Sequence, residues 1–425
     1  MFAESPDTLS QQLRDARRRT RLLIRDLEGP QLFGPKLAIV NPVLWELGHV
    51  AWFQEHWCLR LRADESLSES VLDGADALYD SAKVAHDTRW DLPLPDLSGT
   101  LEFQDRVLER VLARLEREPD NEWFLYFVHL VLYHEDMHAE AFHYTRQTLG
   151  YADPLARSKL PDNAGQGAQD GDAELSGGDF LLGAPRNSGF HFDNEKWAHR
   201  VELEPFSIAR APVTNAQFLE FVREGGYQRR DLWSTEGWNW KNQARGPRYW
   251  VERDGEWRER RFGEELPLDG GLPVMHVNWH EANAYCRYAG RRLPSEAEWE
   301  MAASFSPESG KRRHPWGDSA PNGALANLGG SDRVHVGEFA RGDSAAGCRQ
   351  MLGNVWEWTS STFAPYPGFV CDPYREYSVP WFGTQKVLRG GSFATPSRLI
   401  SNTWRNFYTP DRGDVFAGFR TCPIE

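Results

Sequence analysis

Apolar residues recur at intervals of three and four positions over much of the first 150 residues. This spacing matches the turn of an α-helix, in which such residues share one buried face. It predicts helices over residues 9–27, 43–61, 101–115 and 123–149. Four long helices joined by loops are typical of a bundle. We therefore expect the N-terminal part of the chain to be a four-helix bundle.

Residues that favour helix ends support two of these boundaries. Asn41 and Pro42 stand before the second helix, where Asn is a good N-cap and Pro a good first helical residue. Gly150 follows the fourth helix and is a plausible C-cap. The long connection over residues 62–99 is expected to wrap over one end of the bundle.

The pattern changes after residue 150. A stretch rich in Asp, Ala and Gly predicts a linker, and beyond it short alternating runs at 180–183 and 200–203 predict strands. Short helices are expected near 215–224 and 279–289, the second with Asn278 as its N-cap. The chain has 18 tryptophans, mostly among Gly, Asn, Pro and Arg in its second half. This mixture indicates an irregular, loop-rich fold held by aromatic packing and side-chain hydrogen bonds.

These patterns predict an α+β protein of two domains. The bundle is expected over residues 1–155, the linker over 156–175 and the irregular α+β domain over 176–425. A chain of 425 residues is long enough for two full-sized cores.

Composition excludes some functions. The formal net charge of -14 argues against nonspecific binding to nucleic acid. No segment has the length and apolar character of a membrane span, and the N-terminus lacks the features of a signal peptide. Five scattered cysteines suit a reduced compartment better than a disulfide framework. The sequence therefore predicts a cytoplasmic protein that acts on neither nucleic acid nor membrane.

Three histidines are the strongest chemical signal. His134 and His138 lie four residues apart in the fourth predicted helix, so their imidazoles project from one face. His49 lies in the second predicted helix and is a candidate third ligand. Three neutral imidazoles hold a divalent metal and leave positions open for chemistry. The sequence therefore predicts a metal site formed by His49, His134 and His138.

Two other interpretations of the histidines are open. Histidines at helical spacing are often ordinary polar or half-buried residues, although the apolar segment around this pair would leave each imidazole in need of a partner. The string from His134 to His138 also fits the H-E-x-x-H pattern of zinc hydrolases, in which Glu135 would be the general base. No third ligand follows downstream at the spacing of one such family.

The C-terminal half resembles the formylglycine-generating enzyme, or sulfatase-modifying factor, family, whose fold is an irregular α+β domain like that of C-type lectins. Seven ordered strings carry the resemblance, and they begin at Gly177, Pro212, Pro273, Arg292, Gly353, Leu388 and Phe416. Most of their residues have a structural interpretation: Trp299, Trp356 and Trp358 are expected in the core, and Arg292, Glu296 and Glu300 as buried polar groups. That family uses a cysteine pair in a segment that here spans residues 400–412 and contains no cysteine. Sulfatase activation is therefore not expected.

The N-terminal half resembles DinB-like four-helix bundles. A DinB-like bundle followed by this second domain is similar to the ergothioneine-type sulfoxide synthases and to their relatives, the selenoneine synthases. In that family the iron ligands are a His on the second helix and a His-x-x-x-His pair on the fourth. His49, His134 and His138 match them, and Glu140 matches a following acid. The resemblance thus implies Fe(II) as cofactor.

The resemblance also implies a catalytic tyrosine. The family places it in a Tyr-x-x-Tyr-Ser context, which here begins at Tyr374. We prefer Tyr374 for this role, with Tyr377 as the alternative, and a packing role for both rings is the structural interpretation.

Further matched positions imply the substrate pocket. Arg89 and Arg412 match arginines that hold the thiol γ-glutamylcysteine, whereas the matching Asp is replaced by Tyr408. Met137 stands where ergothioneine enzymes often have Gln. Asn406 and Phe407 are expected to border the pocket for hercynine, the trimethylated betaine of histidine.

These matches imply an O₂-dependent, non-heme iron oxidoreductase that joins selenium or sulfur to C2 of the hercynine imidazole. Because an aromatic ring suits a sugar better than an ammonium group, Tyr408 indicates a selenosugar donor and the selenoneine branch. Three alternatives stay open: an ergothioneine sulfoxide synthase that uses γ-glutamylcysteine or cysteine, a zinc hydrolase, and a non-catalytic binding protein.

Overall fold

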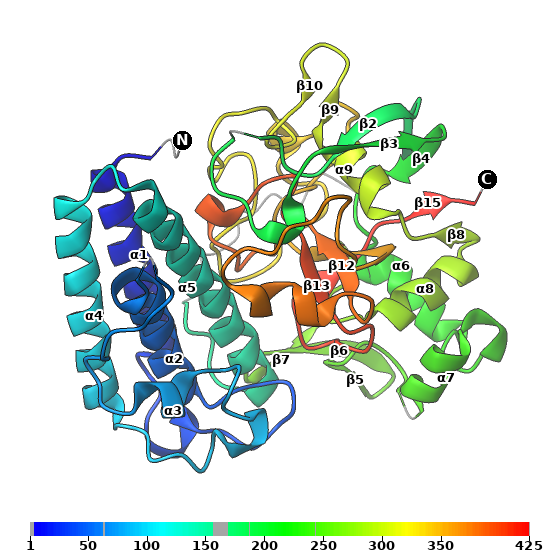
Figure 1. Cartoon of the computed structure of the whole chain (residues 1–425). Helices are drawn as coiled ribbons and strands as arrows, with labels where there is room; N and C mark the ends of the chain where they lie inside the picture. The colour runs from blue at the N-terminus through cyan, green and yellow to red at the C-terminus, as the bar shows by residue number, and fades with distance from the viewer. Residues whose placement is uncertain (1–3, 63, 156–168, 187, 243, 425) are drawn as a thin grey trace. The chain divides into compact units, whose positions relative to one another are not determined.

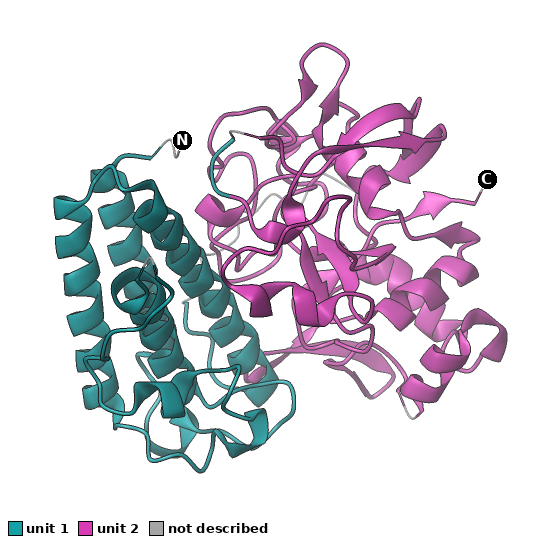
Figure 2. Cartoon of the chain, in the orientation of Figure 1, with its two compact units in different colours: residues 1–155, 187–190 teal, residues 156–186, 191–425 magenta. Residues whose placement is uncertain are grey.

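The computed structural model describes residues 4–62, 64–155, 169–186, 188–242 and 244–424. They fall into two compact units (Figure 2). Unit 1 comprises residues 1–155 with 187–190, and unit 2 comprises residues 156–186 with 191–425. The α+β fold class predicted from the sequence is confirmed.

Unit 1 is a bundle of four long helices with a short fifth (Figure 1). The helices are α1 (Pro6–Ile24), α2 (Val43–Glu55), α3 (Ala75–Tyr79), α4 (Leu97–Arg117) and α5 (Glu122–Leu149). A single π-helical turn, His56–Arg60, extends α2. The four long helices lie where the apolar period predicts them, and Gly150 ends α5 in the left-handed conformation, as expected.

The entry to α2 differs from the prediction. The helix starts at Val43, and Pro42 is its N-cap, with no side-chain cap hydrogen bond. Asn41 does not cap the helix, because its Oδ1 accepts a hydrogen bond of 2.7 Å from Arg89 Nη1 instead. The hydrogen bond to Arg89, which is distant in the sequence, thus replaces the cap that the local pattern predicts for Asn41.

The core of unit 1 contains an apolar cluster and a largely buried α5. Leu23, Leu27, Leu47 and Phe142 pack together with at most 2 % exposure. Most residues of α5 are buried, so its polar side chains need partners within the unit.

Unit 2 consists of short elements joined by long loops. Its helices are α6 (Asn215–Arg223), α7 (Thr235–Lys241), α8 (Trp279–Tyr288) and α9 (Glu296–Ser304). Its strands are β1 (Asp172–Leu175), β2 (Gly178–Leu182), β3 (His199–Leu203), β4 (Phe206–Ala209), β5 (Trp250–Arg253), β6 (Glu256–Arg261), β7 (Glu264–Pro267), β8 (Arg291–Arg292), β9 (Phe305–Ser306), β10 (Gly310–Lys311), β11 (Trp356–Thr362), β12 (Lys386–Arg389), β13 (Asn406–Tyr408), β14 (Ala417–Gly418) and β15 (Cys422–Pro423). The predicted N-cap Asn278 is confirmed.

The largest sheet described in unit 2 has four strands in the order β13-β12-β11-β14, with only β11 and β14 parallel. A three-stranded sheet, β5-β6-β7, and several two-stranded pairs complete the strands described. The predicted linker is only partly testable, since residues 156–168 lie outside the described residues. At its end the prediction was wrong, because residues 172–175 form β1 and pair with β4.

Buried ion pairs hold unit 2 together around its tryptophans. Trp299, Trp356 and Trp358 are at most 1 % exposed, as predicted. Arginine–glutamate pairs are buried in the same unit: Arg389 with Glu300, Arg405 with Glu296, Arg420 with Glu357 and Arg333 with Glu259. Glu296 and Glu300 are buried as expected, but the Arg292 side chain is 37 % exposed and pairs with Glu298 at 2.7 Å.

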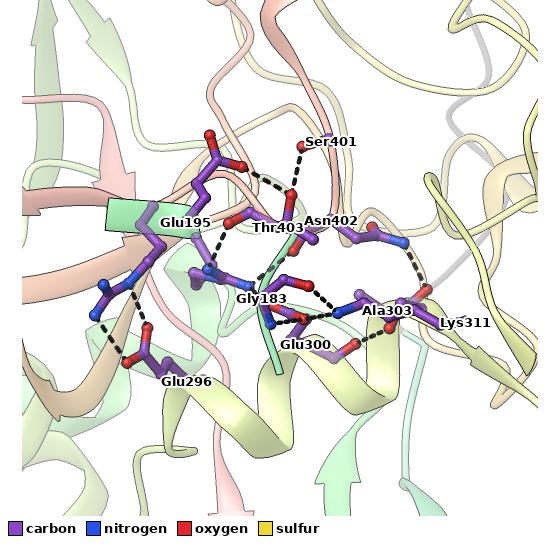
Figure 3. A network of polar contacts seen from close by, with 12 residues as sticks. Gly183, Glu195, Glu296, Glu300, Ala303, Lys311, Ser401, Asn402 and Thr403 are labelled. Carbon is purple, nitrogen blue, oxygen red and sulfur yellow. Dashed lines mark hydrogen bonds and ion pairs between the residues drawn. The ribbon is translucent and has the colours of Figure 1, made fainter. Parts of the chain in front are cut away.

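Glu300 is the centre of one such network (Figure 3). Its carboxylate accepts hydrogen bonds from Arg389, from Lys311 and, at 2.9 Å, from the backbone N–H of Gly183. Burial alone would raise the pKa of Glu300, but the two cations outweigh it, so the pKa is lowered. The network joins the strand β2 region to α9 and β12.

Within the part of the chain that the structure describes, every helix is too short or too polar to cross a lipid bilayer.

We expect Glu300→Ala to destabilise unit 2 by about 3–5 kcal/mol at pH 7, because it leaves Arg389 buried without its carboxylate. Urea unfolding followed by tryptophan fluorescence measures this, with the exposed Glu308 as a control in Glu308→Ala. The pKa of Glu300 is depressed on folding, so its contribution is complete above the unfolded value of about 4.3 and is lost as the pH falls through the folded value. The difference in the free energy of unfolding between wild type and Glu300→Ala should therefore become smaller in acid. Equal stability of the two proteins at pH 7 would contradict this role.

Candidate metal centre

The three predicted histidines come together inside unit 1. His134 and His138 lie one turn apart on α5, and their Nε2 atoms are 3.2 Å apart. His49 from α2 faces both, with ring centroids 5.2 Å from His134 and 5.1 Å from His138. One ligand atom from each ring lies within 4.8 Å of the others. No other cluster of three or more His, Cys, Asp or Glu with this geometry occurs among the described residues.

Hydrogen bonds fix the orientation of two of these rings. His49 Nδ1 lies 2.8 Å from the backbone oxygen of Tyr79, and His138 Nδ1 lies 2.6 Å from Glu46 Oε1. Both partners are acceptors, so each ring carries its proton on Nδ1. The lone pairs are then on Nε2. Partners of this kind, behind the ligands, are typical of metal-binding histidines.

Gly48 makes the contact between α2 and Tyr79 possible. A Cβ atom at this position would lie 2.2 Å from the Tyr79 ring, which is far inside van der Waals contact. Tyr79 is fully buried and supplies the carbonyl that holds His49. The glycine thus lets the end of α3 approach the helix that bears the ligand.

The surroundings of His49 and His134 disfavour the charged form of these two rings. Phe53 stacks on His134 with centroids 3.6 Å apart, and Trp45 stacks on His49 at 5.0 Å. Burial lowers the pKa of His49 to about 3, and burial also lowers the pKa of His134 well below its ordinary value. Neutral imidazoles present the lone pairs that a metal ion needs.

The structure argues against the zinc-hydrolase interpretation. Glu135 is 2 % exposed and points to α1, where its Oε1 accepts from Arg17 Nε at 2.8 Å and from Thr20 Oγ1 at 3.1 Å. A carboxylate committed to a buried arginine is a poor general base for a water at the three histidines.

Arg89 lies behind the cluster. Its guanidinium carbon is 3.9 Å from the Trp45 ring, which in turn stacks on His49. Its Nη atoms donate to Asn41 Oδ1 at 2.7 Å and to the Val84 carbonyl at 3.2 Å. Burial lowers the pKa of Arg89 to about 10, and the charge of Glu46 partly opposes this shift.

The two candidate tyrosines belong to unit 2. Tyr374 caps the 3₁₀ turn Arg375–Tyr377, and the two tyrosine rings are 6.0 Å apart. Tyr377 stacks on Phe192 at 4.4 Å and meets Phe407 edge-on at 5.8 Å. Burial raises the pKa of Tyr377 well above its ordinary value.

The other predicted substrate residues lie on β13 or just after it. Asn406, Phe407 and Tyr408 form this strand, and all three are half-buried. The Arg412 guanidinium lies 4.9 Å from the Tyr408 ring and is bound by the buried Asp414 at 2.6 and 2.7 Å. Unit 2 thus brings Phe407 together with Tyr377, and Arg412 with Tyr408.

Sequence reasoning missed the residues that orient the ligands. Glu46 lies three positions before His49 on α2, so a carboxylate on the ligand face of a helix was a signal that could have been used. Tyr79 contributes a backbone oxygen, and no side-chain pattern indicates such a role.

The donor set fits a divalent transition metal. Three neutral imidazoles suit zinc, copper, iron or nickel, and three nitrogen ligands leave coordination positions open. The residues present therefore fit the iron that the family resemblance implies.

Two family models match the chain. Residues 12–142 match the DinB superfamily, and residues 157–423 match the sulfatase-modifying factor enzyme 1-like domain. The hercynine oxygenase of Mycolicibacterium smegmatis is 37 % identical over 428 residues, covering 97 % of this chain and 98 % of the relative. The hercynine oxygenase of Mycobacterium tuberculosis is also 37 % identical, with 98 % of each chain covered. The formylglycine-generating enzyme of Streptomyces coelicolor is 32 % identical over 280 residues, 59 % of this chain and 88 % of the relative.

Fold, histidine cluster and family models together define a two-domain protein with a DinB-like bundle and a sulfatase-modifying-factor domain. The near full-length identity is more specific: the chain belongs to the hercynine oxygenase family, the ergothioneine-type sulfoxide synthases that its sequence resembles.

We expect replacement of His49, His134 or His138 by Ala to remove most bound iron, because two imidazoles hold the ion much more weakly than three. Iron content after anaerobic loading with Fe(II) measures this, and circular dichroism checks the fold. His86→Ala is a suitable control, since His86 lies in the same unit but binds the Val40 carbonyl. Full iron occupancy in His49→Ala would remove that residue from the site.

We expect Glu46→Gln to weaken metal binding by about 10- to 100-fold with the three ligands intact, because a neutral amide holds the His138 ring less firmly than a carboxylate. Competition with a chromogenic chelator measures the affinity. Glu122→Gln, at an exposed position of the same unit, should bind as wild type does. Unchanged metal affinity in Glu46→Gln would mean that Glu46 does not strengthen metal binding by His138.

Proposed function

We propose that this protein is an iron- and O₂-dependent oxidoreductase that forms a bond between a chalcogen and C2 of the hercynine imidazole. The C2–H bond and the chalcogen–H bond are lost and the C2–chalcogen bond forms, which releases two electrons and two protons. O₂ accepts them as H₂O₂, or it accepts four electrons in all when one oxygen atom goes to the chalcogen as a selenoxide or sulfoxide and the other leaves as water. We propose a selenosugar as the preferred donor, which makes the protein a selenoneine synthase.

One observation carries the first part of the proposal. A buried cluster of three histidines lies in a chain that aligns over 97 % of its length with hercynine oxygenases. The relatives' name states an oxygenation of hercynine, and the cluster offers a place for the metal that such chemistry requires. The three histidines belong to unit 1 and the matched tyrosine belongs to unit 2.

Iron, when bound, supplies the activation of O₂ and a position for the chalcogen. His49 and His138 would hold the ion through Nε2, since the Tyr79 carbonyl and Glu46 engage their Nδ1 atoms. Because all three ligands are neutral, the ion keeps its full charge. Phe53 and Trp45 cover the rings and exclude water from them.

Tyr374 provides the proton or hydrogen atom in this proposal, through its Oη. Delivery at the right moment favours the C–chalcogen bond over oxidation of the donor alone. Tyr377, held between Phe192 and Phe407, is the alternative for this role.

The donor preference rests on Tyr408. Its ring stands where ergothioneine enzymes have an Asp that pairs with the amine of γ-glutamylcysteine. Arg412 lies over the ring at 4.9 Å, and the proposal places the sugar of the donor against the same aromatic side chain. A neutral sugar needs no carboxylate partner there.

Arg89 supports an anionic donor atom. It is 9 % exposed. Burial of a cation is costly, and a selenolate or thiolate would add to the stabilising charge that Glu46 already provides. A selenol is already anionic at neutral pH, because it is more acidic than a thiol.

A second candidate function is an ergothioneine sulfoxide synthase that uses γ-glutamylcysteine or cysteine. The near full-length identity to hercynine oxygenases favours it. An aerobic assay of the Fe(II)-loaded protein separates the candidates when hercynine is offered with a selenosugar, γ-glutamylcysteine and cysteine in parallel. Mass spectrometry identifies the product. Hercynine left unchanged with every donor would exclude both synthases and favour a binding protein.

We expect Tyr374→Phe to retain iron and substrate binding but to lose most C–Se or C–S product, with oxidised donor formed instead, because the hydroxyl that delivers the proton is gone. Product ratios by mass spectrometry test this. If Tyr377→Phe has this effect and Tyr374→Phe does not, Tyr377 is the catalytic tyrosine.

We expect wild type to use γ-glutamylcysteine poorly. Loss of the partner for its ammonium group costs about 2–5 kcal/mol, which is roughly a thirty-fold to several-thousand-fold loss in kcat/KM. Competition kinetics measure the ratio of kcat/KM for the selenosugar to kcat/KM for γ-glutamylcysteine. This ratio should be smaller in Tyr408→Asp. Equal or better use of γ-glutamylcysteine by wild type would place this chain in the ergothioneine branch.

A further inference from the structure

A buried turn in unit 2 contacts both segments that carry the proposed substrate and catalytic residues. The turn is the 3₁₀ helix Asp193–Glu195, here called the DNE turn. Its three polar side chains are at most 3 % exposed. Charged side chains are seldom buried this fully unless they are paired with other groups. None of the motifs considered in the sequence includes it.

The DNE turn holds the segment that follows Tyr374. The Ser378 hydroxyl, which is fully buried, donates to the Asp193 carboxylate and accepts from Asn194 Nδ2 at 3.0 Å. Phe192, next to the turn, stacks on Tyr377. Hydrogen bonds to a carboxylate are stronger than those between neutral groups, so Ser378 is held firmly.

A second contact fixes the same segment at its start. Lys196, directly after the turn, forms an ion pair of 2.6 Å with Asp372. The segment between Asp372 and Ser378 contains exposed residues, Arg375 and Glu376 among them. It has little core of its own, so its position depends on these attachments and on the packing of Tyr377 against Phe192 and Phe407.

The other side of the DNE turn binds the approach to β13. Thr403 Oγ1 donates to Glu195 at 2.8 Å, a contact visible in Figure 3. Arg405 Nη1 donates to the Asn194 backbone oxygen at 2.8 Å, and Arg405 also pairs with Glu296. β13 follows directly, with Phe407 in contact with Tyr377. One turn thus sets the relative position of the tyrosines and the proposed hercynine residues.

We propose that Asp193, Asn194 and Ser378 are positioning residues for the reaction, and that they set the tyrosine segment against β13. The proposal rests on the proposed function for its catalytic consequence, but not for the clamp itself. A reactive group displaced by about 1 Å loses on the order of 100-fold in rate, so a loosened tyrosine should deliver its proton poorly. The donor would then be oxidised without joining hercynine.

Ser378→Ala in the full-length, Fe(II)-loaded protein tests the clamp in two independent ways. In hydrogen–deuterium exchange, the amides of residues 372–381 should exchange at least about tenfold faster than in wild type. The exchange of α5 should be unchanged. Aerobic turnover with hercynine and the best donor should show the ratio of C–chalcogen product to oxidised donor fall by about 10- to 100-fold, with iron content unchanged. Ser378→Thr keeps the hydroxyl and should restore both.

Ser319→Ala is the matched control, because Ser319 is an exposed serine of the same unit. If Ser378→Ala does not fold, Asp193→Asn serves instead, since it keeps the size and one acceptor but removes the charge. Unchanged exchange of residues 372–381 in the folded variant would overturn the clamp. Faster exchange with an unchanged product ratio would overturn the positioning role. Wild type that makes no C–chalcogen product would overturn the proposed function, and the exchange result would still decide on the clamp.

Discussion

The rotation of α5 about its own axis is the constraint on which the candidate metal centre depends. α5 is buried along most of its length, so each polar side chain must find a partner in the unit. Glu135 pairs with Arg17 of α1, and His138 pairs with Glu46 of α2. These two bonds join α5 to two different helices and together fix its orientation. A rotated α5 would leave Arg17 buried without a carboxylate, which is strongly unfavourable.

Groups outside the three histidines fix the geometry of the candidate metal centre. Gly48 admits the Tyr79 ring, and the Tyr79 carbonyl then fixes the proton of His49. Trp45 links the same histidine to Arg89, the one substrate residue predicted for unit 1. Tyr79 and Arg89 both lie in the connection between α2 and α4. A change in this connection would therefore affect the position of His49 as well as that of Arg89.

Unit 2 replaces regular sheet with buried ion pairs. Its strands are short, and backbone hydrogen bonds alone could not hold the long loops between them. Glu300, Glu296 and Glu357 each bind an arginine that also donates to backbone carbonyls of distant loops. Loops fixed in this way can present Tyr374, Tyr408 and Arg412 in defined positions, because the network leaves few alternative arrangements.

The sequence by itself determined the helices of the bundle, the placing of His134 and His138 on one helix face, the family and the tryptophan core. These follow from local periodicity, from spacing within one helix or from ordered motifs, and each is encoded by residues close together in the chain. Tertiary structure alone decided that Asn41 binds Arg89 instead of capping α2, that residues 172–175 pair with β4, and that Glu135 serves Arg17. It also decided that Ser378 meets Asp193 and that a backbone oxygen of Tyr79 orients His49. Such partners come from distant parts of the chain, and a hydrogen bond between them leaves no period or spacing in the sequence.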